Sequence, residues 1–472
     1  MKIRLIHLII LLCAGLVLST LWFAARGADL ASADGSVVCT YSHRLPDDPI
    51  IYPGRPGIAM QHDFFGHTTT TADTTTEDLY TERDSTCENA ADNTAYWAPS
   101  LKLPDGTVVA PSYQKTYYQN RAYPSQASRQ VTPFPPGLQM LAGDHHGSAP
   151  SPIINFLCTG RGYTTTIPIN CVPDPTKGTQ FNIALAFPNC WDGIHLSPFR
   201  GGANNVAYAD ADGVCPAAYP VPLPLISLNI AYMVGNITDM TGTMLSMDPT
   251  LDQDGNVVNL NWGSLYTAHA DFFNGWTEGA MRYLVEYCLN KGRSCGRQVA
   301  YSFADTLGDA TVRGGDTAHE NYGQATSLLA QQAVGDVPES KFYIQFDIPK
   351  GALDIPVAFT PEYRLLIRGA NTAPVAEIIR AYRTPIHWHE DNITSNNAPV
   401  CEGPSATLYL DQAENYRYFN VTQLVNDAIA AGEQTISFCI RGNPSGNGFR
   451  FDSSETDNKP ILYLYAVNPI TP

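Results

Sequence analysis

The sequence predicts a mainly β protein built from two β-rich domains. The chain is rich in Thr, Tyr, Asn, Pro and Gly, runs of alternating apolar and polar residues recur between Pro and Gly turns, and helical periodicity is scarce. Its 472 residues also exceed what one hydrophobic core usually organises. We therefore expect a first domain over residues 34–289, a linker over 290–299 and a second domain over 300–472.

The amino terminus is expected to be a signal peptide, residues 1–33. Lys2 and Arg4 precede an apolar run over residues 8–23, and small residues follow at 31–33. The mature chain would then begin near Asp34 and be secreted or held at the cell surface, with no stable membrane insertion after cleavage. Because the apolar run is long for a signal peptide, an uncleaved membrane anchor is the alternative.

The charge balance limits the classes of partner. The formal net charge is −17, and removal of the first 33 residues leaves the chain acidic. Such a field repels phosphate backbones and anionic lipid surfaces, which argues against nucleic-acid binding. A polysaccharide or cell-wall glycan is the expected partner, and a neutral polymer is the easier one to accommodate.

The cysteines predict a disulfide framework. Of eleven cysteines, Cys13 lies in the signal segment and ten remain, an even number that suggests five disulfides in a secreted chain. Cys401 and Cys439 stand alone in the second domain, so they pair if the domains are autonomous. The connectivity of the other eight is open, and no Cys/His spacing typical of a zinc site occurs.

Several segments predict individual elements. Residues 94–103 alternate, residues 104–106 form a turn and residues 107–110 return, which predicts a hairpin. Apolar residues at helical spacing over 278–288 predict one short helix, followed by a linker that Cys288 and Cys295 could close. Residues 252–256 resemble the start of a calcium loop, but residue 263 is Gly where such a loop ends in Glu, so a turn is expected.

A repeated pattern marks the first candidate site. The run 269–276 begins His-Ala-Asp-Phe-Phe and echoes His-Asp-Phe-Phe at 62–65. On a strand His269 and Asp271 would share one face, and could hold a metal or move a proton. If the two runs are neighbours, four residues would converge beside four phenylalanines as a catalytic site: His62, Asp63, His269 and Asp271. The alternative is structural, a buried His bonded to a neighbouring Asp.

Two other polar stretches are candidate substrate contacts. Asp144, His145 and His146 follow an apolar strand and could bind substrate or a metal, with an ordinary surface loop as the alternative. Trp191, Asp192 and His195 follow Cys190 within one expected loop. Sugars stack on Trp faces and bond to carboxylates, so this loop could contact carbohydrate, whereas a disulfide packed on a core Trp is the alternative.

The ordered motifs of the first half resemble a known secreted family of unknown function, DUF1996. They stand at residues 48–54, 62–66, 96–99, 134–138, 143–144, 190–193, 215–216 and 269–276. The resemblance implies an extracellular domain found in polysaccharide or cell-wall contexts, with no settled reaction to carry over. One departure is that residues 261–264, Asn-Trp-Gly-Ser, stand where the family usually has a Gly-Asp pair.

The second half resembles DNRLRE-type modules, carbohydrate-binding module family 96. The matching stretches are 305–312, 321–323, 343–348, 388–399, 419–425, 451–455 and 459–460. The resemblance implies a β-sandwich of jelly-roll type and carbohydrate binding. The residues themselves predict one short helix, capped by Thr422 and carrying Leu424, Val425, Ala428 and Ile429. Such modules often carry calcium, for which Asp305, Asp309 and Asp452 are the candidate ligands; aspartates that cap turns without a metal are the alternative.

Two functions remain open from sequence. The first is a secreted polysaccharide- or cell-wall-binding protein, whose second domain holds the glycan. The second is a polysaccharide-processing hydrolase or lyase, with Asp271 or Asp63 as acid/base carboxylate and His269 or His62 as its partner or as a metal ligand. Motifs of other enzyme classes, such as a nucleophile elbow or a phosphate loop, do not occur.

Overall fold

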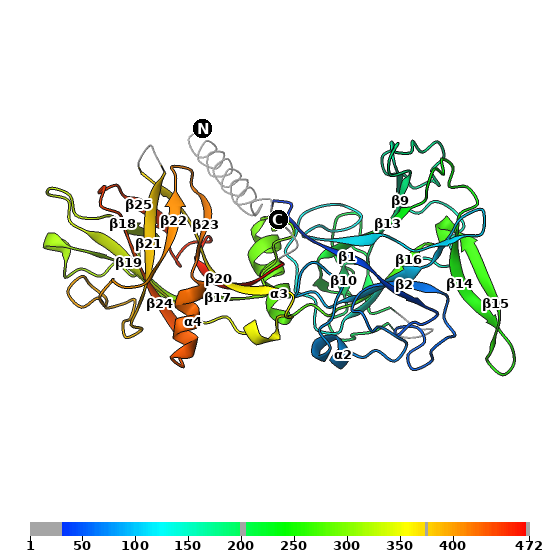
Figure 1. Ribbon diagram of the computed structural model, residues 1–472, viewed down its shortest axis with the longest axis horizontal. Helices are drawn as coiled ribbons and strands as arrows, with labels where there is room; N and C mark the ends of the chain where they lie inside the picture. Colours follow the sequence, from blue (N-terminus) through cyan, green and yellow to red (C-terminus); the bar gives the residue numbers. More distant parts are fainter. Residues whose placement is uncertain (1–30, 199–203, 373–375, 469–472) are drawn as a thin grey trace, which may run out of the picture.

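The computed structural model describes residues 31–198, 204–372 and 376–468, and it confirms a mainly β fold in two units (Figure 1). The predicted signal peptide lies outside the described residues except for residues 31–33. The first strand, β1 (Asp34–Leu45), begins where the mature chain is expected to begin. Among the described residues, no helix has both the length and the apolar character needed to cross a membrane.

A nine-stranded antiparallel sheet forms the first unit, in the order β7-β16-β3-β2-β1-β6-β13-β9-β8. Besides β1, its strands are β2 (His62–Gly66), β3 (Ala95–Pro99), β6 (Tyr113–Gln119), β7 (Gln139–Gly143), β8 (Ile154–Cys158), β9 (Gln180–Ala186), β13 (Leu225–Met233) and β16 (His269–Phe273). The halves of the sheet pair with different parts of β1, whose register shifts between Tyr41 and Arg44.

The two halves of this sheet face each other across a core. The hydroxyl of Tyr96 on β3 lies 2.5 Å from that of Tyr118 on β6, and the indole of Trp276 donates to Tyr118 at 2.9 Å. All three side chains are fully buried. Because strand residues alternate between faces, the neighbours of Tyr96 on β3 point to the outer face of the layer, where the candidate site lies.

Smaller elements surround the main sheet. They are α2 (Thr76–Thr81), the four-stranded sheet β15 (Val257–Ser264), β14 (Met244–Leu251), β4 (Leu101–Lys102) and β5 (Val108–Val109), and the three-stranded sheet β11 (Val206–Ala207), β10 (Cys190–Trp191) and β12 (Val221–Pro222). The pairing of β4 with β5 confirms the predicted hairpin. Residues 252–256 form the turn between β14 and β15, as expected.

The predicted helix over 278–288 is present but changes character along its length. It consists of α3 (Glu278–Arg282), a π-helical turn η2 (Tyr283–Cys288) and a short η3 (Leu289–Lys291). The Thr277 side chain accepts from the backbone of Ala280 and begins the helix. The expected linker is fastened to the first unit, because Cys288 is bonded to Cys295 and the Gly296 carbonyl accepts from Ser36.

The second unit is a ten-stranded sheet that folds into the expected β-sandwich. Its strands are β17 (Ser302–Arg313), β18 (Ser327–Ala330), β19 (Ser340–Asp347), β20 (Thr360–Asn371), β21 (Glu377–Thr384), β22 (Ser405–Leu410), β23 (Asn415–Asn420), β24 (Thr435–Arg441), β25 (Phe449–Asp452) and β26 (Ile461–Val467), with short turns η4 (Gly315–Thr317) and η5 (Ala352–Asp354). Phe342 of β19 packs against Phe451 of β25 from the opposite layer, with ring centroids 5.4 Å apart.

The one short helix of this unit is α4 (Thr422–Ala430), which buries Leu424, Val425 and Ala428 as expected, whereas Ile429 is exposed. The expected cap at Thr422 is wrong. Thr422 is already helical, and its hydroxyl accepts from the Tyr363 backbone while Asn420 accepts from the Thr422 backbone. An Asn side chain therefore takes the role expected of the Thr hydroxyl.

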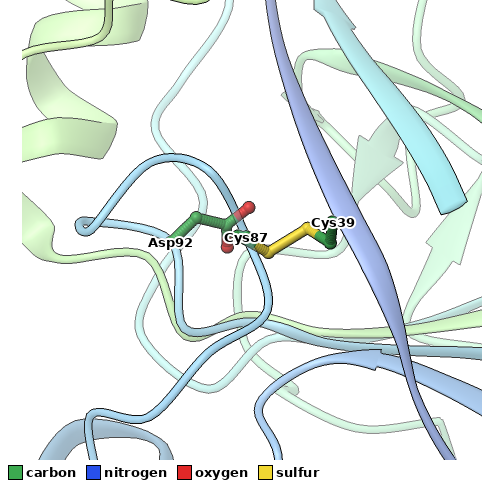
Figure 2. Close-up of side chains that lie close together, drawn as sticks. All are labelled: Cys39, Cys87 and Asp92. Atoms are coloured by element: carbon green, nitrogen blue, oxygen red, sulfur yellow. A yellow bond between two sulfur atoms is a disulfide. The ribbon is translucent and has the colours of Figure 1, made fainter. Parts of the chain in front are cut away.

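All ten cysteines of the described chain form disulfides. The pairs are Cys39–Cys87, Cys158–Cys171, Cys190–Cys215, Cys288–Cys295 and Cys401–Cys439. The pair predicted for the second domain is thus confirmed. Figure 2 shows Asp92 beside the Cys39–Cys87 disulfide; because both sulfurs are bonded to each other, this group offers no thiolate to a metal.

The helical segment 278–291 lies between the two units (Figure 1). Tyr283 packs against Phe303 and Tyr463 with ring centroids 5.8 and 5.9 Å away. The guanidinium of Arg293 lies between the rings of Tyr287 and Tyr416 at 4.7 and 4.5 Å. The interface is therefore aromatic and continuous with both cores. Beside it opens a groove of about 950 Å³.

Candidate functional site

The two repeated motifs flank one strand on the outer face of the first sheet. Register places Phe64 of β2 and Asp271 of β16 opposite Trp97 of β3, which lies between them. His62 and His269 share this face by alternation, and their ring centroids are 6.1 Å apart at an interplanar angle of 89°. The predicted meeting of His62, His269 and Asp271 is therefore observed.

Asp63 does not join this group. It lies on the opposite face, where Arg44 donates to both carboxylate oxygens at 2.6 and 3.0 Å. Burial raises the pKa of Asp63 to about 6 although the Arg44 charge opposes the shift. The expected convergence of four residues is thus corrected to three. The four phenylalanines also divide between two clusters. Phe65 and Phe272 belong to the main core, whereas Phe64 and Phe273 pack in a separate cluster with Trp97.

Backbone carbonyls orient both imidazoles. His62 Nδ1 lies 2.9 Å from the Asp47 carbonyl, and His269 Nδ1 lies 2.9 Å from the Thr267 carbonyl. Because a carbonyl only accepts, Nδ1 carries the proton in each ring and Nε2 keeps its lone pair. His62 Nε2 and Asp271 Oδ2 are buried without a hydrogen-bond partner, whereas His269 is partly exposed.

Burial controls the protonation of the group. It lowers the pKa of His62 to about 4, and burial together with the nearby His62 lowers that of His269 to about 3. Burial and the charge of Asp48 raise the pKa of Asp271 well above its usual range. Both imidazoles are therefore neutral at neutral pH, and each keeps one unprotonated ring nitrogen.

Two further carboxylates near the group were missed by the sequence reasoning. Asp48 is buried and accepts from the backbones of Ile50 and Ile51, and burial raises its pKa to about 6. Asp248 on β14 accepts from the Tyr52 hydroxyl at 3.1 Å. Asp48 opens the first motif that carries the family resemblance and could have been chosen on that ground; no local pattern distinguishes Asp248.

His145 lies at the rim of the same group. Its ring centroid is 6.1 Å from that of His269 and 3.9 Å from that of His146, on the exposed loop after β7. Asp144 accepts from the His146 backbone and shapes this loop. Gly143 has φ 99°, and a Cβ there would lie 2.2 Å from the Ala268 carbonyl, so only Gly allows the loop to approach β16.

The loop with Trp191, Asp192 and His195 lies apart from this group. Its polar atoms bond within the loop: the Trp191 indole donates to the His195 carbonyl at 2.7 Å, and Asp192 pairs with the His195 ring at 2.6 Å. Burial raises the pKa of Asp192, but hydrogen bonds from His195 outweigh it and lower the value. A sugar contact by this loop stays a prediction.

A second candidate surface lies on the outer face of the sandwich. Lys341, Arg441 and Arg380 stand side by side on β19, β24 and β21. Their neighbours Phe342, Ile440 and Ile379 are core residues, so the three cations point outward. Glu339 accepts from Arg441 at 2.7 Å and lies 3.7 Å from Lys341, leaving the row with net positive charge.

An exposed aromatic ring adjoins this row. Tyr409 on β22 is 67% exposed and pairs with Ile378 of β21, two residues before Arg380. Thr407 pairs with Arg380 itself. A flat ring beside cations is the combination that stacks on a sugar ring while binding its acidic or hydroxyl substituents. We call Lys341, Arg380, Arg441 and Tyr409 the cationic face.

The three predicted calcium ligands do not converge. Asp305 pairs with Lys459 at 2.7 Å and Asp452 with Arg368 at 2.8 Å, so both carboxylates already have a cation. The expected set is thus corrected. Asp309 instead meets Glu390 and Glu455, with one oxygen from each within 4.8 Å of the others. Asp309 Oδ1 is buried without a hydrogen-bond partner.

Comparison with known families identifies both units. Residues 48–276 match the family model of a domain of unknown function, DUF1996, and residues 300–466 match that of carbohydrate-binding module family 96. The first unit is therefore similar to the DUF1996 family and the second unit to family 96 modules. The second description indicates carbohydrate binding.

The other comparisons add no argument about function. No curated protein matches this chain. One solved structure, a glycoside hydrolase family 43 arabinoxylan arabinofuranohydrolase from Bacillus subtilis in complex with cellotetraose, is 10% identical and covers 88% of this chain and 80% of its own. Its TM-score of 0.12 is too low to indicate a shared fold.

Proposed function

We propose that this protein is secreted and binds polysaccharide of a cell wall or matrix through its family 96 module. The observation that carries the proposal is the match of nearly the whole second unit to a carbohydrate-binding family. Five disulfides support an oxidising, extracellular setting. The acidic charge supports a glycan over a nucleic acid.

The cationic face is the proposed place of glycan binding. Lys341, Arg441 and Arg380 on adjacent strands repel one another, and Glu339, which pairs with Arg441 and lies near Lys341, offsets this repulsion only in part. A chain of sugars could run across the three strands, with carboxylate groups on the guanidinium groups and one ring stacked on Tyr409. We therefore infer that polysaccharides containing uronic acids bind better than neutral ones.

A sedimentation assay tests this proposal with the full chain. The protein is mixed with insoluble neutral and uronate-rich polysaccharides, and the unbound fraction is measured. Wild type is expected in the pellet with acidic polymers, and Arg380→Ala combined with Arg441→Ala is expected in the supernatant. Arg450→Ala, an exposed cation on β25 of the other layer, is the matched control and should sediment like wild type. Wild type that stays soluble with every polymer refutes glycan binding.

We propose that the module binds calcium at Asp309, Glu390 and Glu455. The donor set is all oxygen, which suits a hard cation, and the buried unpaired Oδ1 of Asp309 is the observation that fits one. The ion would neutralise three carboxylates that otherwise repel one another and join the second half of β17 to the loops at 390 and 455. Its role is structural.

A second candidate function is polysaccharide processing in the first unit. The observation that favours it is the group of His62, His269 and Asp271, in which the imidazole of His269 is partly exposed. A hollow of about 400 Å³ opens over Phe273, at the other end of β16. Release of reducing ends or unsaturated products from a polysaccharide panel by wild type, and its loss in His269→Ala, tests this candidate; no release from any polymer argues against it.

A further inference from the structure

Two buried atoms without a hydrogen-bond partner, His62 Nε2 and Asp271 Oδ2, belong to residues that lie together in the first unit. We propose that His62, His269 and Asp271 bind one divalent transition-metal ion of the zinc type, a property that goes beyond polysaccharide binding. Each residue offers one ligand atom, and these atoms all lie within 4.8 Å of one another. Zinc ligands sit about 2.0–2.2 Å from the metal, so two of them are at most about 4.4 Å apart. Small side-chain rotations would therefore close the site.

A structural His–Asp pair does not explain this arrangement. Such a pair would be joined by a hydrogen bond, yet His62 Nε2 and Asp271 Oδ2 have no partner. His62 and Asp271 are 1% and 2% exposed, so water does not reach these atoms freely. Buried polar atoms without partners are costly, and these two belong to residues whose ligand atoms lie within 4.8 Å of one another. One cation between them would satisfy both, together with the lone pair of His269.

The surroundings of the imidazoles are those of metal ligands. In each ring Nδ1 donates to a backbone carbonyl, Asp47 for His62 and Thr267 for His269. This second hydrogen bond fixes the ring and leaves Nε2 as the donor to a metal, the usual support for a ligating histidine. Because the supports are main-chain atoms of neighbouring segments, the site is organised before any ion arrives.

The donor set selects the class of ion. Two imidazole nitrogens and one carboxylate oxygen suit zinc and its neighbours, whereas calcium prefers six or more oxygens. The carboxylates of Asp48 and Asp248 lie close enough to act electrostatically on the group, which adds the negative charge that a divalent ion needs. The site is therefore distinct in chemistry from the all-oxygen group at Asp309.

The site would keep one side open. His269 is partly exposed, and the exposed His145 lies with its ring 6.1 Å away. Three protein ligands would leave the fourth position of a tetrahedral ion to a ligand from outside the protein. That position could take water or an oxygen of a bound ligand, which is the arrangement of reactive rather than purely structural zinc sites.

Metal binding is measured on the full secreted chain, stripped with a chelator and then equilibrated with zinc or calcium. Wild type is expected to hold one zinc per chain by mass spectrometry, and the cobalt form to show the visible bands of a four- or five-coordinate ion. Asp271→Asn and His269→Gln, which keep side-chain size, should weaken zinc affinity at least 100-fold. Circular dichroism checks that both variants fold.

His195→Gln is the matched control, because His195 is also paired with a carboxylate but lies outside the group. It should keep full zinc affinity. The proposal is overturned if folded wild type binds no zinc, if it binds calcium in preference to zinc, or if both site variants retain one zinc per chain. Glycan sedimentation of Asp271→Asn and His269→Gln should be unchanged, so failure here is distinguishable from failure of polysaccharide binding.

Discussion

At the scale of single residues, buried carboxylates set the electrostatics of the first unit. Asp92 is fully buried, and its oxygens accept from the Thr94 backbone at 3.0 Å and from the Tyr96 hydroxyl at 2.7 Å. Tyr96 in turn meets Tyr118, which accepts from Trp276. This chain of hydrogen bonds joins the two halves of the sheet, and its one ionisable end, Asp92, makes stability depend on pH.

Burial raises the pKa of Asp92 to about 6 despite those hydrogen bonds. The folded chain therefore keeps a proton that the unfolded chain releases near pH 4, and stability falls as pH rises from 4 to 6. Asp92→Asn should remove this dependence, with a difference from wild type of ~3 kcal/mol or less between pH 4 and 7. Urea unfolding at several pH values measures it; parallel profiles for the two proteins would contradict this account.

The residue scale also shows where sequence reasoning succeeded and failed. Strand alternation correctly placed His269 and Asp271 on one face. The same rule, applied to the adjacent pair His62 and Asp63, separates them, yet both were expected in the site. The error came from treating a repeated motif as a unit. The missed Asp248 comes from a distant hairpin, and only the tertiary fold brings it near.

At the scale of elements, hydrophobic periodicity predicted which segments form helices and strands. It predicted less well how each helix is wound and which segments pair with each other. The helix over 278–288 is present, but its π-helical turn has no signature in the apolar spacing. The Cys401–Cys439 disulfide followed from counting, whereas the pairing of the other eight cysteines depends on which strands become neighbours. The calcium candidates failed for a related reason: Lys459 and Arg368 come from other strands to pair with Asp305 and Asp452.

The revised carboxylate group gives a prediction at the element scale. Calcium at Asp309, Glu390 and Glu455 would tie β17 to two loops, so adding calcium to stripped protein should raise Tm by roughly 5 °C. Asp309→Asn should abolish this response. Asp305→Asn, whose carboxylate is neutralised by Lys459, should preserve it. Scanning calorimetry measures Tm with added calcium and with a calcium-selective chelator. A rise in Tm of Asp309→Asn equal to that of wild type would exclude the site.

At the scale of the whole molecule, an aromatic interface fixes the two units to each other. Tyr283 lies between Phe303 and Tyr463, and the side chain of Arg293 donates to Asn458 of the second unit at 2.9 Å. The Thr277 hydroxyl also donates to the Tyr301 carbonyl. The linker expected between autonomous domains is therefore part of a packed junction, and binding experiments belong on the full chain.

The whole-molecule charge explains why sequence favoured a neutral glycan. The net charge of −17 sums over the whole chain and does not describe any one surface. Exposed charges are screened over about 8 Å at physiological ionic strength, so a ligand responds mainly to the charges near it. Lys341, Arg441 and Arg380 are far apart in sequence, so their row exists only after β19, β24 and β21 have paired. Local charge on the cationic face can therefore bind an acidic polymer on an acidic protein.

The most direct measurement is the affinity of the full chain for a soluble uronate-rich polysaccharide by titration calorimetry. The account predicts saturable binding, a Kd at least tenfold higher for Arg380→Ala combined with Arg441→Ala, and an unchanged Kd for Arg450→Ala. Equal affinity of wild type and the double variant, or no heat of binding with wild type, would contradict it.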